Sequence, residues 1–90
     1  YVVPLGDDLK RLAARVSDTI RKVASSNYDL MGRKLGKNLK YAADNSIPYV
    51  VIIGSREVEE GIVLVRDMKS GEEKRIPIPD IVEFFNEVIN

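Results

Sequence analysis

The sequence predicts an α/β domain in which helices cover both faces of a mixed five-stranded sheet, as three layers α/β/α. Two observations lead to this prediction. Residues 49–53 are continuously apolar and mostly β-branched, as in a strand buried on both faces. Segments with helical periodicity alternate with strand-like segments over the first half of the chain, which is typical of parallel strands joined by helices. The expected element order is β-α-β-α-β-β-β-α.

Length and composition limit what the chain can do. Its 90 residues suffice for a single core, so we expect residues 1–90 to be one domain. Because the chain starts at Tyr1 without a Met, we expect this domain to be cut from a longer protein. Fourteen basic residues balance fourteen acidic ones, so the net charge gives no indication of nucleic acid. The absence of Cys and His removes thiolate metal sites and the commonest catalytic base. No apolar run approaches the roughly 20 residues that span a bilayer, so we expect no membrane partner.

The first half of the chain predicts two strands and two helices. Residues 1–5 form a short apolar run that predicts the first strand. Apolar residues then recur every three or four positions, which predicts a helix over residues 7–24. Residues 25–30 alternate polar and apolar side chains and predict a short edge strand. Residues 33–44 predict a second helix with a leucine and alanine packing stripe.

The second half predicts short, directly connected strands followed by a helix. The Ser70-Gly71 pair is typical of a hairpin turn, so the strands on either side should be antiparallel. Pro77 confines the last strand to an edge of the sheet, because proline cannot donate to the ladder. The expected elements are a charged loop at residues 55–60, strands at residues 62–65 and 74–78, and a helix from residue 79.

One face of the second predicted helix is basic. Several flexible cations on one surface, with an amide and an aromatic ring beside them, suit the phosphates and bases of a nucleic acid. A solvated helix face has the same pattern and explains most such runs, so both interpretations stay open on these residues alone. The residues concerned are Arg33, Lys34, Lys37 and Lys40, flanked by Asn38 and Tyr41.

Glu57 and Arg66 are charged residues that could read bases. Glu57 lies in the loop after the central strand, and a carboxylate accepts from the cytosine amino group or the Watson–Crick edge of guanine. Arg66 ends the next strand and can donate to guanine or stack on a base. On these residues alone, pairing with neighbours is the favoured explanation, since Asp67 and Glu72 are close to Arg66 in sequence.

Four short motifs follow one another along the chain. They are Gly-Arg-Lys-Leu-Gly-Lys-Asn-Leu-Lys-Tyr-Ala-Ala-Asp from Gly32, Ile-Pro-Tyr-Val-Val-Ile-Ile-Gly from Ile47, Glu-Val-Glu-Glu-Gly from Glu57, and Val-Arg-Asp from Val65. In this order the series resembles the anticodon-binding domain of class II aminoacyl-tRNA synthetases, over essentially the whole chain. The histidyl group is the most similar, although the segment from Glu57 to Arg66 also looks threonyl.

The resemblance implies a non-catalytic domain, without cofactor or metal, that docks the anticodon stem-loop of a tRNA. It implies that Glu57 and Arg66 meet anticodon bases. The parent would be a cytoplasmic, homodimeric histidine–tRNA ligase, whose catalytic domain contacts this one and binds ATP and Mg²⁺. Residues expected to hold the RNA backbone or flanking nucleotides are Arg33, Lys34, Lys37, Asn38, Lys40, Tyr41 and Arg56.

Strand geometry adds a constraint on how these two residues act. Arg66 is five residues beyond Gly61, about 16 Å along a strand at roughly 3.3 Å per residue, whereas Glu57 precedes that strand. We therefore expect Glu57 and Arg66 to meet different nucleotides. Other possibilities are a threonyl- or prolyl-type synthetase domain, a synthetase-like paralogue that serves as an interaction or dimerisation module, and a small carboxylate enzyme or ligand-binding domain.

Overall fold

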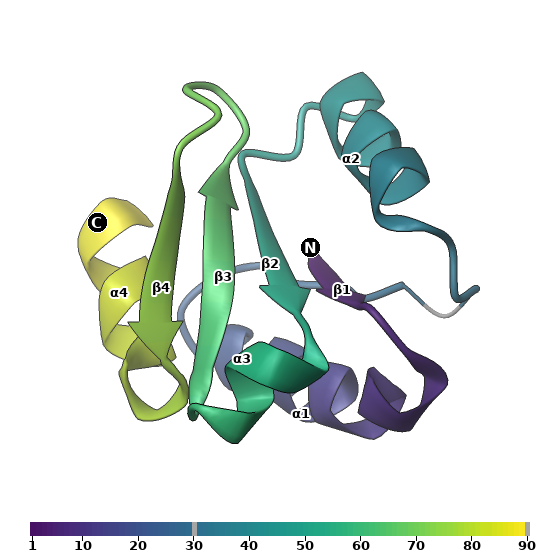
Figure 1. Cartoon of the computed structure of the whole chain (residues 1–90). Coiled ribbons are helices and arrows are strands. Elements are labelled where there is room, and N and C mark those ends of the chain that lie inside the picture. Colours follow the sequence, from purple (N-terminus) through teal and green to yellow (C-terminus); the bar gives the residue numbers. More distant parts are fainter. Residues whose placement is uncertain (30, 90) are drawn as a thin grey trace.

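A four-stranded mixed sheet forms the centre of the molecule (Figure 1). The computed structural model describes residues 1–29 and 31–89. Strand β1 runs parallel to β2, and β2, β3 and β4 are successively antiparallel, as the sequence predicts. In sheet order, the strands are β1 (Val2–Pro4), β2 (Tyr49–Ile53), β3 (Ile62–Asp67) and β4 (Glu73–Pro77).

A fifth strand was predicted at residues 25–30, but residues 25–29, the part that the structure describes, do not form one. Tyr28 makes one isolated parallel bridge to Val2, in which the Val2 N–H donates to Asn27 and the Asp29 N–H donates to Val2. Beyond that bridge, the Asp29 carboxylate accepts hydrogen bonds from backbone N–H groups farther along the chain, which turns the segment away from the sheet. Leu30, the last residue of the predicted strand, lies outside the described residues.

Helices cover the two faces of the sheet in the predicted three layers. Val51, Ile53 and Val63 pack against α1 and α4 on one face, whereas Val50 and Ile52 pack against α2 on the other. None of the described helices is long and apolar enough to cross a membrane. The main helices are α1 (Lys10–Ile20), α2 (Leu35–Asp44) and α4 (Ile81–Ile89), and the 3₁₀ turns η1 (Asp7–Leu9) and η2 (Ile78–Asp80) precede α1 and α4.

The predicted charged loop after β2 contains a short helix, α3 (Ser55–Glu59). Gly54 caps its N-terminus with extended backbone angles, and Val58 packs against the core on the α1 side. The prediction was wrong here because five residues with one apolar side chain show no helical periodicity. The helix lies at the end of the sheet where β2 finishes (Figure 1).

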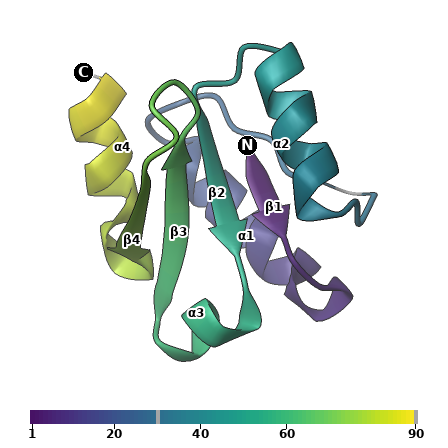
Figure 2. The same ribbon diagram turned by 45° about the horizontal axis from the view of Figure 1, so that its top comes forward.

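One part of the sheet surface is left without a helix. Leu64 pairs with Ile52, which packs against α2, so alternate residues of β3 and β4 point to the α2 side. Figures 1 and 2 show α2 on the β1 side of this face, away from β4. We call the uncovered part the open face. It comprises Ile62, Leu64 and Arg66 on β3, and Glu73, Arg75 and Pro77 on β4.

Candidate nucleic-acid interface

The basic residues of α2 and of the turn before it lie at the surface, as the sequence predicts. Lys40 is balanced by Asp44, with 2.9 Å between its Nζ and the Asp44 Oδ2. Lys34 and Lys37 form no ion pair with any residue that the structure describes. These two lysines are therefore the strongest local attraction that α2 offers to an anion.

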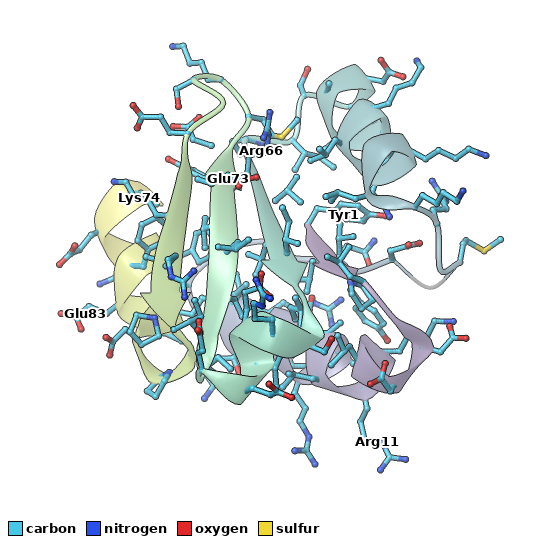
Figure 3. All side chains as sticks on the ribbon, in the orientation of Figure 1. Tyr1, Arg11, Arg66, Glu73, Lys74 and Glu83 are labelled. Carbon is cyan, nitrogen blue, oxygen red and sulfur yellow. The ribbon has the colours of Figure 1, made fainter. Side chains whose placement is uncertain are left out.

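Arg33 lies over an aromatic pair beside these lysines. Its guanidinium carbon is 5.3 Å from the centroid of the Tyr41 ring, and the Tyr41 ring is 5.1 Å from that of Tyr1. Tyr41 is 37% exposed, so part of this surface faces solvent. Tyr1 lies next to α2 (Figure 3). A ring and a guanidinium exposed together can stack on a nucleotide base.

Asn38 is buried, although the sequence predicts it as a surface contact for RNA. Its side chain is 0% exposed. Its Nδ2 donates to the Asp29 carboxylate at 3.0 Å, and its Oδ1 accepts from the Tyr1 hydroxyl at 2.9 Å. The side chain points inward because the chain brings a buried carboxylate beneath α2. Asn38 therefore does not reach the surface on which RNA would lie.

Asp29 is the residue beneath α2 that sequence reasoning missed. It is 2% exposed and accepts hydrogen bonds from Asn38 and from the backbone N–H groups of Met31 and Arg33. Burial alone would raise the pKa of Asp29, but these hydrogen bonds outweigh it and hold the pKa below its ordinary value. The carboxylate is therefore ionised at neutral pH. Its importance arises from contacts that the sequence pattern does not show.

Arg66 forms an ion pair on the open face. Its Nη1 is 3.3 Å from the Glu73 Oε2, and the two side chains lie together on β3 and β4 (Figure 3). The partner is neither Asp67 nor Glu72, because β-sheet register places Glu73 directly opposite Arg66. The Arg66 Nε is buried and has no hydrogen-bond partner in the described structure. A second pair on this face joins Arg75 to Glu60.

Glu57 and Arg56 lie on α3, at the other end of β2. Glu57 is partly buried and folds back over Gly54, so that a Cβ built on Gly54 would lie 2.7 Å from the Glu57 Oε2. Arg56 is exposed. Arg66 pairs with Val50 near the start of β2, whereas Glu57 follows the end of that strand. The structure thus keeps Glu57 and Arg66 apart, at opposite ends of the sheet.

The chain matches a known family along almost its whole length. The family model described as an anticodon binding domain matches residues 1–88. The chain is 41% identical over 90 residues to the histidine–tRNA ligase of Pyrococcus furiosus, covering 99% of this chain and 21% of that protein. It is 42% identical over 93 residues to the histidine–tRNA ligase of Thermococcus kodakarensis, covering 100% of this chain and 21% of that protein.

A solved structure gives the same indication. The crystal structure of histidyl-tRNA synthetase from Nostoc sp. PCC 7120 superposes with a TM-score of 0.91 at 26% identity, covering 99% of this chain and 22% of that one. The chain spans about a fifth of the length of the proteins that it matches. The comparisons therefore concern one part of those proteins.

Proposed function

The chain belongs to the anticodon-binding domain family, and we propose that it binds the anticodon stem-loop of a tRNA on the surface formed by α2, the open face and α3. One observation supports this location above the others. Lys34 and Lys37, which have no ion-pair partner among the described residues, lie beside the exposed Arg33–Tyr41 stack. Phosphate attraction and a stacking surface therefore occur side by side, as single-stranded RNA recognition requires.

We propose that some residues of this surface bind the RNA backbone and that others recognise its bases. Lysines that contact phosphates carry no sequence information, so Lys34, Lys37 and Lys40 would position the loop, together with Arg56 on α3. Glu57 and Arg66 can form hydrogen bonds with base edges. Because they lie at opposite ends of β2, each would meet a different nucleotide of a splayed anticodon.

We further propose that the parent protein is a histidine–tRNA ligase. Relatives with that name match the chain along its whole length at 41% and 42% identity. Aminoacylation with ATP and Mg²⁺, homodimer formation and a cytoplasmic location would then be properties of the parent, and its catalytic domain would be the protein partner of this one. A threonyl- or prolyl-type parent would keep the same fold but prefer other anticodons.

Titration of the 90-residue chain with anticodon stem-loops of several specificities tests this function. We expect the histidine stem-loop to bind most tightly, and point changes in its anticodon to weaken binding. Glu57→Ala and Arg66→Ala should each lose discrimination at a different nucleotide. Glu59→Ala on α3 and Lys74→Ala, which lies opposite Val65 and so on the α4 side of the sheet, are matched controls that should bind normally.

Two outcomes of this titration would contradict the proposal in different ways. Equal binding of all stem-loops, or of none, would remove the anticodon-reading function and favour an interaction or dimerisation module. Loss of discrimination at one shared nucleotide in both Glu57→Ala and Arg66→Ala would keep the function but contradict the division into two separate contacts. Preference for a threonine or proline stem-loop would change the parent alone.

A further inference from the structure

We propose that Asp29 and Asn38 form a buried pair of positioning residues that hold Arg33 and the start of α2 in the arrangement that RNA meets. The proposal rests on the RNA-binding function proposed above and deepens it. Neither side chain reaches the surface, since Asp29 is 2% and Asn38 0% exposed. They are joined directly, with 3.0 Å between the Asn38 Nδ2 and the Asp29 Oδ2.

The pair holds the Arg33 backbone from both sides. The Arg33 N–H donates to the Asp29 Oδ2 at 2.9 Å, and the Arg33 carbonyl accepts from the Asn38 Nδ2 at 3.1 Å. The Met31 N–H donates to the other Asp29 oxygen, also at 2.9 Å. Hydrogen bonds to a buried carboxylate are stronger than those between neutral groups. The turn that leads into α2 is therefore fixed at the residue that carries the guanidinium.

The pair also acts on the Arg33 side chain and on the aromatic rings. The Arg33 Nε is 3.9 Å from the Asp29 Oδ1, which draws the side chain toward α2 and over the Tyr41 ring. The Tyr1 hydroxyl donates to the Asn38 Oδ1 at 2.9 Å, while the Tyr1 ring packs on Tyr41. All three members of the exposed stack thus touch the pair or a residue that it holds.

This arrangement explains why an amide and a carboxylate occur beneath a basic helix. The N-terminus of α2 has no side-chain cap, because Lys34 occupies the N-cap position. Asn38 does not replace this cap, which would have to accept from N–H groups, but it ties the turn to the helix by donating to the carbonyls of Arg33 and Lys34. A flexible cation loses less conformational entropy on binding when its position is already fixed, so such a pair increases affinity without touching the ligand.

A double-mutant cycle with the full 90-residue chain tests the inference. The variants are Asp29→Asn, Arg33→Ala and their combination, and the measurement is the dissociation constant of the tightest stem-loop. We expect each single variant to weaken binding by about tenfold, and the double variant to weaken it hardly further, because Asp29 acts through Arg33. Independent losses that multiply in the double variant would overturn the inference.

Ser17→Ala is the matched control for a general loss of stability. Ser17 is 0% exposed and forms a 2.8 Å hydrogen bond with Ser26, and it has no hydrogen bond to Asp29, Asn38 or Arg33 in the described structure. Its removal should lower stability and leave RNA affinity unchanged. If Asp29→Asn does not fold, Tyr1→Phe replaces it in the same cycle, because this change removes one bond to Asn38 and keeps the ring. A folded Tyr1→Phe with unchanged affinity would then overturn the inference.

Hydrogen exchange without RNA separates the inference from the proposed function. The backbone N–H groups of Met31 and Arg33 should be protected in the wild-type chain and exchange at least tenfold faster in Asp29→Asn. Fast exchange in the wild-type chain would contradict the positioning pair even if RNA binds. Protection in a chain that binds no stem-loop would instead contradict the proposed function and leave the pair without RNA to act on.

Discussion

Arg66 on β3 and Glu73 on β4 are directly opposite each other in the sheet and form an ion pair, with 3.3 Å between Nη1 and Oε2. The guanidinium proposed to meet a base is thus already partly neutralised by a neighbour. Because Glu73 offsets its charge, Arg66 should attract the phosphates of any RNA less strongly than an unpaired arginine would. Glu73 would therefore reduce binding to the wrong RNA as well as orient Arg66.

Glu73→Gln should loosen this selectivity. We expect tighter binding of all stem-loops at low salt, by a few-fold, and a smaller difference between matched and mismatched anticodons. Stability should change by less than about 1 kcal/mol, because partly exposed ion pairs contribute little. Stem-loop titrations measure the first effect and urea denaturation the second. Glu72→Gln removes the same charge from a residue without an ion pair in the described structure, and equal behaviour of both variants would contradict a specific role for Glu73.

Gly54→Ala should disturb Glu57 without straining the backbone. Gly54 has φ −108° and ψ 154°, which any residue adopts, but an added Cβ would lie 2.7 Å from the Glu57 Oε2. The carboxylate must swing away, so discrimination at the nucleotide that Glu57 reads should fall. The free energy of unfolding should change by less than about 1 kcal/mol. A variant with wild-type discrimination would show that Glu57 acts from another orientation.

The lysines of α2 should differ in their contribution to salt-dependent binding. Lys34→Ala and Lys37→Ala should each reduce the slope of log affinity against log salt by roughly 0.7 to 0.9. Lys40→Ala should reduce it less, because Asp44 already balances this charge at 2.9 Å. Affinities at several salt concentrations give the slopes. Unchanged slopes in all three variants would identify α2 as an ordinary solvated helix face.

Gly36→Ala tests whether the RNA backbone needs the space that the missing side chain of Gly36 leaves on α2. A Cβ on Gly36 would have no atom within 4 Å, so no described protein element requires the glycine. Alanine should stabilise the helix by about 0.5–1 kcal/mol and raise Tm by about 4–8 °C per kcal/mol. Thermal unfolding measures this gain. A simultaneous loss of stem-loop affinity would show that the RNA backbone approaches α2 at this position.

Acid should destabilise the chain partly through Asp29. The pKa of Asp29 is lower in the folded chain than its ordinary value of 3.8, so its contribution to stability is complete above that pH. The contribution is lost as the pH falls through the lowered folded value. Urea denaturation between pH 7 and pH 2 measures this dependence. Asp29→Asn should be less stable at neutral pH and show a shallower loss below about pH 4, whereas an unchanged slope would assign the acid sensitivity to other carboxylates.

The strongly patterned elements were predictable from the sequence, because their own residues determine them. The run from Tyr49 to Ile53 is apolar at every position and forms β2 with the predicted limits. Pro77 does lie in the edge strand β4, as its missing N–H requires. Elements stabilised by contacts with distant residues were not predictable, as α3 shows, whose only apolar anchor is Val58.

The candidate site was predictable as a set of surface charges but not as an arrangement. Lys34 and Lys37 are exposed, as a run of charged residues on one helix face indicates. Asn38 is in the same run but points the other way, because Asp29 is buried beneath it. The sequence does not show whether an aspartate is buried or solvated. The inward orientation of Asn38 therefore depends on tertiary structure that the sequence pattern does not reveal.

The length of β3 sets the spacing between the two proposed base contacts. Glu57 precedes this strand and Arg66 lies near its far end, so two inserted residues would move Arg66 outward by about 6.6 Å and keep it on the same face. A single inserted residue would instead move its guanidinium to the other face of the sheet, at the position that Asp67 now holds. We therefore expect related domains that recognise differently spaced nucleotides to have β3 longer or shorter by an even number of residues.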